Sequence, residues 1–336
     1  MVVPRLQYLY LYTGLASPIG DMEGNLLYVG LDSNWNYFNI GRDLAALNAK
    51  NEEVVDRDGH VAGYMCNIRV AAGPATPASI NFITAPNTWK MRNAVRKTHF
   101  LRQAMFEDAG VTESEMGKYG KTLRPHLTTA QVSDTVYKDP YYLRPVNDSP
   151  SAGGTLSTLT GGEWSYTTLA SSPSWDNTPL INHDSLPMAD TYTIAICGPN
   201  REQDDAGGIK SWSTIGLINS YNLDRMEQIP DATADSSISG TNNPFAMLQS
   251  QSVVSGEVAE IAEDQQLETP PYDITDDGDS VELLYNTRVI ANVTESVRNV
   301  SLFVPAGLFA VTCTAALSGA IMTVDVVGKV LCKDIA

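Results

Sequence analysis

The stretch from Val281 to Cys332 reads as a row of β-strands, and it limits the possible fold more than any other part of the chain. Val, Ile, Thr, Phe and Leu dominate its successive segments VELLY, TRVIANVTE, RNVSLFVP, GLFAVTCTA and IMTVDVVGKVLC. Asn, Gly, Pro and Ser separate these segments at intervals of roughly 8–12 residues, which is typical of short strands in an antiparallel β-sandwich. The stretch therefore predicts an all-β architecture.

The first half of the chain has the same character. Alternating or continuous apolar residues predict further strands at 5–13, 26–30, 60–73 and 79–85. The segment GRDLAALNAKN at 41–51 predicts a short helix. Strands therefore occupy both ends of the chain.

A helical period interrupts the strands between Thr88 and Ala109. Pro86, Asn87 and Thr88 supply a start signal, and Gly110 supplies a stop. We expect one face of this helix to pack on a sheet; its members are Met91, Ala94, Val95, Thr98, Leu101 and Met105. The opposite face is polar and carries Arg92, Arg96, His99 and Gln103.

Residues 145–162 have the composition of a linker. Pro, Ser, Gly, Thr and Asn dominate them, and no apolar periodicity survives. We therefore predict a first domain at 1–150, with a helical insertion at 88–120. A second domain is predicted at 151–336, with a helical or loop insertion at 207–267.

The charge distribution limits the kinds of partner. The net charge is −17, which disfavours nucleic acids and anionic membranes. Residues 200–280 hold 16 acidic and three basic side chains, whereas residues 86–124 hold eight basic and four acidic ones. Such asymmetry suits head-to-tail self-association. The predicted interface residues are Arg92, Arg96, Lys97 and His99; a solvated surface is the alternative.

The sequence has no motif that specifies an enzyme. It lacks a nucleophile elbow, a phosphate-binding loop and a dinucleotide fingerprint, so we expect no catalytic residues and no cofactor. The four cysteines lie in apolar runs without metal-site spacing and are predicted to be buried thiols. A weak candidate for calcium binding is the acidic cluster Asp273, Asp276, Asp277 and Asp279.

Two strand-rich halves, the segment WKMRNAVRKTHFLRQAMFEDAG between strands, and the closing strands NVSLFVPAGLFAVTC and IMTVDVVGKVLC resemble a viral capsid protein. The resemblance is to the double jelly-roll major capsid proteins of tailless icosahedral viruses, including lipid-containing phages. It implies an all-β fold with helical insertions: two antiparallel eight-stranded sandwiches, or alternatively a single jelly roll with long insertions.

The resemblance also implies a function. The protein would form homotrimers and then an icosahedral shell in the virion, contacting other capsid or vertex proteins and, in some such viruses, an underlying membrane. No direct binding to nucleic acid is expected. The sequence has no recognisable signal peptide or membrane-spanning run, so we expect synthesis in a host cytoplasm. A carbohydrate-binding or adhesin module and a glycan-active enzyme on the same scaffold remain the alternatives.

Overall fold

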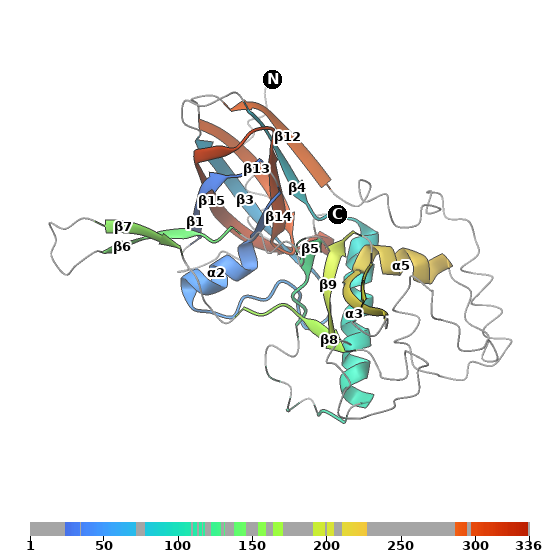
Figure 1. Ribbon diagram of the computed structural model, residues 1–336. Helices are drawn as coiled ribbons and strands as arrows, with labels where there is room; N and C mark the ends of the chain where they lie inside the picture. Colours follow the sequence, from blue (N-terminus) through green and yellow to red (C-terminus); the bar gives the residue numbers. More distant parts are fainter. Residues whose placement is uncertain are drawn as a thin grey trace, which may run out of the picture. The chain divides into compact units, whose positions relative to one another are not determined.

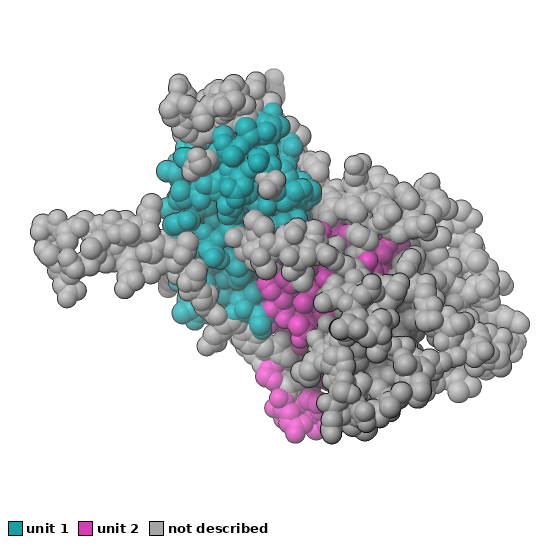
Figure 2. Space-filling view, viewed as in Figure 1, with its two compact units in different colours: residues 1–87, 135–165, 285–336 teal, residues 88–134, 166–284 magenta. Residues whose placement is uncertain are grey.

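The computed structural model describes residues 24–33, 35–71, 78–108, 110–112, 114–115, 117, 122–128, 131, 138–145, 154–158, 164–170, 191–198, 200–204, 210–226, 286–293 and 297–334. These residues are mostly β, with few helices. The chain forms two compact units, each assembled from separate stretches of sequence (Figure 2). Unit 1 comprises residues 1–87, 135–165 and 285–336, and unit 2 comprises residues 88–134 and 166–284.

Unit 1 contains two antiparallel sheets (Figure 1). The six-stranded sheet has the order β13-β3-β15-β1-β6-β7, and the four-stranded sheet has the order β12-β4-β14-β2. Their strands are β1 (Asn25–Leu31), β2 (Asn36–Asn39), β3 (Ala62–Ala71), β4 (Ala78–Thr84), β6 (Tyr141–Pro145), β7 (Gly154–Thr158), β12 (Asn286–Val293), β13 (Val297–Pro305), β14 (Leu308–Cys313) and β15 (Leu317–Leu331). A short 3-10 helix at Cys332–Asp334 follows β15.

Strands from the two ends of the chain alternate in these sheets. β1 pairs with β15, β2 with β14, β3 with β13 and β4 with β12, all antiparallel. β3 also pairs with β15, and β4 with β14. The sandwich is therefore built from contacts between residues that are far apart in sequence.

Side chains between the two sheets form the core of unit 1. Tyr28 of β1 packs edge-on against Phe38 of β2, with ring centroids 4.8 Å apart. Phe38 in turn stacks on Phe309 of β14 at 4.7 Å. Along β15, Met322 and Val324 are buried while Thr323 and Asp325 face outward, which is the period of two expected for a half-buried strand.

Helix α2 (Ile40–Asn48) begins directly after β2. The side chain of Asn39 accepts a hydrogen bond from the backbone N–H of Arg42, which caps the helix. The backbone carbonyl of Gly307, in the corner between β13 and β14, accepts a bond from Ile40 N–H at 2.8 Å. Gly307 has a φ of +71°, and a Cβ there would lie 3.0 Å from Gly41 N, so the corner requires glycine.

Unit 2 contains a smaller mixed sheet and two helices. The sheet has the order β10-β11-β9-β5, and β8 also pairs with β9. Its strands are β5 (His126–Thr128), β8 (Thr168–Ala170), β9 (Thr191–Cys197), β10 (Arg201–Asp204) and β11 (Lys210–Gly216). β9 runs parallel to β5 and β11, and its residues 194–197 are all buried, as expected for a central parallel strand.

The long helix of unit 2 confirms the predicted helical segment. Helix α3 spans Trp89–Asp108, and Thr88 Oγ1 accepts a bond from Met91 N–H at its start. At its end, Gly110 N–H bonds to the Glu107 carbonyl and Val111 N–H to the Phe106 carbonyl. With a φ of +74° at Gly110, these two bonds form a Schellman motif.

Helix α3 packs against α5 (Leu217–Met226), a partner that was not predicted from the sequence. The Trp89 ring lies edge-on to the Tyr221 ring at 6.4 Å, and the Asn93 amide donates to Tyr221 Oη. The part of α3 nearest this contact is the best buried part of the helix.

The arrangement differs from two consecutive sandwiches. Strands of residues 286–331 pair with strands of residues 25–84, so both ends of the chain share one sandwich. Within the expected linker, Pro145 and Gly154 belong to the paired strands β6 and β7. Part of the expected linker therefore forms an antiparallel strand pair in unit 1.

Candidate functional site

The four predicted interface residues all lie on α3. Arg96 is exposed, with its guanidinium carbon 5.6 Å from the centroid of the exposed Phe100 ring. Arg92 and Lys97 are half-buried. Unit 2 thus presents a cation and an aromatic ring at its surface, a combination that is enriched in protein interfaces.

His99 is buried, with 2% of its surface exposed, although the sequence analysis places it on the polar face. An apolar stripe on a helix runs through positions i, i+3, i+4, i+7 and i+8. Counted from Met91, these positions are Met91, Ala94, Val95, Thr98 and His99, and all five are buried. The stripe therefore includes His99, while Leu101 is only half-buried.

The two stretches of opposite charge both fall within unit 2, at 88–134 and 166–284. The predicted domains at 1–150 and 151–336 separated these two stretches. The acidic cluster Asp273, Asp276, Asp277 and Asp279 lies outside the described residues. Within the part of the chain that the structure describes, no group of three or more His, Cys, Asp or Glu side chains could hold a metal ion.

A polar array on the outer face of the six-stranded sheet is the strongest candidate binding surface. Four strands contribute two cross-strand rows. One row contains Asn299, Arg69, Thr323 and Leu27, and the next contains Ser301, Asn67, Asp325 and Asn25. We call these eight residues the sheet-face array. They line a depression of about 530 Å³, within the range of ligand sites on proteins.

Hydrogen bonds between neighbouring strands fix the orientation of this array. The Ser301 hydroxyl donates to Asn67 Oδ1 at 2.8 Å, and Arg69 Nε donates to Asn299 Oδ1 at 3.2 Å. Both amide oxygens already accept a bond, so the amide nitrogens are the groups through which the exposed Asn67 and Asn299 can donate to a ligand. Asp325 is exposed and supplies carboxylate acceptors in the same row as Asn67.

The row beyond Leu27 and Thr323 is apolar. It contains Val29, Ile321 and Ala71, which are paired across β1, β15 and β3. Ile321 is 46% exposed. The outer face of the sheet therefore changes from apolar to polar within three rows.

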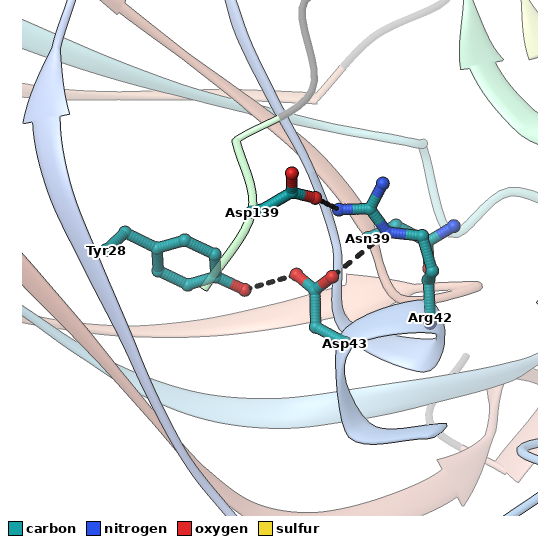
Figure 3. Close-up of polar contacts among 5 residues, drawn as sticks. All are labelled: Tyr28, Asn39, Arg42, Asp43 and Asp139. Carbon is teal, nitrogen blue, oxygen red and sulfur yellow. Dashed lines mark hydrogen bonds and ion pairs between the residues drawn. The ribbon is translucent and has the colours of Figure 1, made fainter. Parts of the chain in front are cut away.

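A second polar cluster surrounds the buried Asp43 in the first turn of helix α2 (Figure 3). The Tyr28 hydroxyl donates to Asp43 Oδ2 at 2.6 Å, and Arg42 Nε donates to Asp43 Oδ1 at 3.0 Å. Arg42 also bonds Asp139 at 2.7 Å, directly before β6. The cluster thereby ties β1, α2 and the start of the β6–β7 hairpin together.

Burial decides the protonation of this cluster. It raises the pKa of Asp43 from 3.8 to about 6, even though Arg42 and the Tyr28 hydroxyl both favour the ionised form. Burial and the neighbouring Asp43 carboxylate raise the pKa of Tyr28 well above its usual value, so Tyr28 remains a donor at neutral pH. Unit 1 therefore contains a buried carboxylate that changes its protonation near pH 6.

A related cluster holds the loop before β3. Glu52 Oε1 accepts bonds from the Tyr64 hydroxyl and from Lys329 Nζ, each at 2.6 Å. Lys329 also donates to the Glu53 carbonyl. These bonds link the loop to β3 and β15, and so have a structural role in the sandwich.

The titratable groups in apolar surroundings are kept neutral. All four cysteines are buried and free, as predicted. Burial raises the pKa of the Cys313 thiol to about 11 and those of Cys66 and Cys197 further, so these thiols remain protonated at neutral pH. In unit 2, His126 stacks on Tyr166 at 3.6 Å, and burial lowers the His126 pKa to about 3.

The sheet-face array was not predictable from the sequence. Asn67 and Arg69 stand out as polar residues in β3, but their neighbours come from β13 and β15, more than two hundred positions away. A period of two identifies the outward side chains of one strand without identifying the adjacent strand. The signal that was available is the alternation itself, which places Thr323 and Asp325 outward.

Comparison with known proteins adds no relative: no family model, no curated protein and no solved structure matches this chain. Among the residues that the structure describes, no helix has the length and apolar character needed to cross a membrane.

Proposed function

We propose that unit 1 is a single jelly roll, the alternative with long insertions. Numbered along the chain, its eight principal strands are β1, β2, β3, β4, β12, β13, β14 and β15. The first pairs with the eighth, the second with the seventh, the third with the sixth and the fourth with the fifth. These are the pairs of one long folded hairpin, which is the strand arrangement that makes a jelly roll when it is rolled up.

Two further pairs support the rolled form. A flat hairpin would leave the third strand separated from the eighth, and the fourth from the seventh. Here β3 pairs with β15, and β4 pairs with β14. These pairs generate the sheet orders 6-3-8-1 and 5-4-7-2, with β6 and β7 added at one edge. Unit 2 has parallel pairs and is better understood as an insertion between β4 and β12 than as a second roll.

We propose further that the protein is the structural subunit of an icosahedral virus shell. The strand pairing of unit 1 is the observation that carries this proposal, because jelly rolls are common in viral capsid proteins. The insertion between the fourth and fifth strands supports it, since insertions in this class supply contacts between subunits. Fold alone does not fix function, so assembly itself has to be measured.

The test is sedimentation velocity of the purified full-length chain over a range of concentrations, followed by electron microscopy of the fastest species. We expect trimers and, at higher concentration, closed symmetric particles. A folded chain that stays monomeric over the whole range would overturn the proposal. Arg57→Ala, a substitution at an exposed position in unit 1, serves as the control variant and should assemble like wild type.

A further inference from the structure

We propose that the sheet-face array is a binding site for a neutral, hydroxyl-rich ligand, namely a short saccharide. The proposal does not depend on shell assembly, because it rests on side chains within one sandwich. It starts from the dimensions of the array. Neighbouring strands are about 4.8 Å apart and alternate residues on one strand about 6.8 Å apart, so the array covers about 14 by 7 Å.

The hydrogen-bonding groups favour hydroxyls over other ligands. Asn67, Asn299 and Arg69 offer donors, while Asp325 offers acceptors beside them. A hydroxyl both donates and accepts, so adjacent hydroxyls can bond to an amide nitrogen and to a carboxylate at once. Side-by-side donors and acceptors of this kind are complementary to a diol.

Charge argues against the main alternatives. An anion would meet Arg69 but also Asp325, and the whole chain carries −17. A calcium ion prefers six to eight oxygen ligands, whereas the described lining offers one carboxylate. A ligand without net charge avoids both conflicts.

The neighbouring apolar row completes the match. A sugar ring has hydroxyls around its edge and C–H groups on its faces. Leu27, within the array, and the exposed Ile321, in the next row, provide an aliphatic surface for those C–H groups. The polar rows can therefore bond to the hydroxyls of a saccharide while the apolar side chains contact its C–H groups.

The experiment is a titration of the full-length protein with neutral trisaccharides (cellotriose, mannotriose and N-acetylchitotriose), followed by saturation-transfer NMR and calorimetry. Inorganic phosphate serves as the anionic probe. Asp325→Ala and Arg69→Ala should each weaken saccharide binding about tenfold or more, because each removes a charged hydrogen-bonding partner. Thermal unfolding should not change, since both side chains are exposed.

The matched controls are Asp334→Ala and Arg57→Ala, which remove the same charges from exposed positions outside the array. They should bind saccharide like wild type. The proposal is overturned if no trisaccharide binds, if phosphate binds instead, or if the controls weaken binding as much as the array variants. Sedimentation of every variant tests shell assembly separately from saccharide binding. If no saccharide binds and the array variants fail to assemble, the outer face of the sheet is a contact between subunits, and the saccharide proposal is overturned.

Discussion

Helix α2 carries a buried carboxylate into unit 1, whereas the buried stripe of helix α3 in unit 2 contains no carboxylate. Asp43 is fully enclosed in the first turn of α2, where it bonds Tyr28 and Arg42. In α3, Met91 and Val95 are completely buried, while Arg96 on the other side is exposed. One helix is held partly by a polar cluster and the other by apolar packing.

The difference has consequences for stability. The apolar residues of the α3 stripe contribute through the area that they remove from water, and that contribution does not depend on pH. A buried carboxylate contributes according to its protonation state, so it makes stability depend on pH. Apolar substitutions in α3 should therefore lower the free energy of unfolding at every pH, whereas substitution of Asp43 in α2 should change how that free energy depends on pH.

The largest effect is expected for Val95→Asp in α3. An unpaired charge at this fully buried position should lower the stability of unit 2 by about 4 kcal/mol or more. Leu101→Asp should cost only about 1–2 kcal/mol, because Leu101 is half-buried and its carboxylate can reach water. Urea denaturation followed by circular dichroism would measure both. Equal losses for the two variants would contradict the assignment of the stripe.

The next effect concerns how Asp43 in α2 makes the free energy of unfolding depend on pH. Because burial raises the folded-state pKa of Asp43 from 3.8 to about 6, its protonated form favours the fold. This contribution is complete below about pH 4 and is lost as the pH rises through 6; a shift of about two units corresponds to about 3 kcal/mol. Asp43→Asn has no charge to titrate, so its unfolding free energy should lack this fall between pH 4 and 6.

The measurement is the free energy of unfolding in urea at several pH values for wild type and Asp43→Asn. Asp58→Asn, at an exposed position in unit 1, serves as the control and should keep the wild-type profile. If the unfolding free energies of wild type and Asp43→Asn change with pH in the same way, Asp43 is not the group that makes stability depend on pH.

A smaller effect separates the two tyrosine–carboxylate clusters of unit 1. Tyr28→Phe removes a donor from the enclosed Asp43 and should cost about 1–3 kcal/mol, while raising the pKa of Asp43 further. Tyr64→Phe should cost about 0.5–1.5 kcal/mol, because the Glu52 side chain is 11% exposed and keeps its bond to Lys329. Denaturation of both variants at pH 7 would check the order, and the reverse order would contradict the role of burial.

The smallest effect on folding is expected on the polar face of α3. Reversing Arg92 and Arg96 to Glu should change the free energy of unfolding only slightly, because Arg96 is exposed, Arg92 is half-buried, and charges near the surface contribute about 0–1 kcal/mol each. Assembly of this variant should weaken if the polar face of α3 meets an acidic surface of a neighbouring subunit. Raised salt should also weaken wild-type assembly, because the electrostatic screening length falls from about 8 Å at physiological ionic strength to about 3 Å at 1 M. Wild-type-like sedimentation of the double variant at all salt concentrations would remove α3 from the interface.

Local signals made α3 predictable. Thr88 and Gly110 act within a few residues of the helix ends, and the 3.6-residue period identifies most of the buried stripe. The strands β3, β4 and β13 to β15 were predictable for the same reason, because alternation is a property of a single segment.

Long-range contacts were not predictable from these signals. No local pattern indicates that β1 pairs with β15, that β9 runs parallel to β5, or that Asp43 meets Tyr28. A buried aspartate in an otherwise ordinary helical segment has the same sequence signature as an exposed one. The sheet-face array has the same origin, since its members meet only when the ends of the chain pair.

The alternation of chain ends in the sandwich has a consequence for synthesis. β3 lies between β13 and β15, β4 lies between β12 and β14, and within the described sheets no two of β1 to β4 are neighbours. About 200 residues separate the end of β4 at Thr84 from the start of β12 at Asn286. At about 5–20 residues per second, the ribosome needs roughly 10–40 s to make that stretch. During this interval β1 gains β6 as a neighbour, but β2, β3 and β4 still lack the strands that pair with them in the finished sheets. Their open edges are then exposed to pairing with other chains until β12 to β15 have been made.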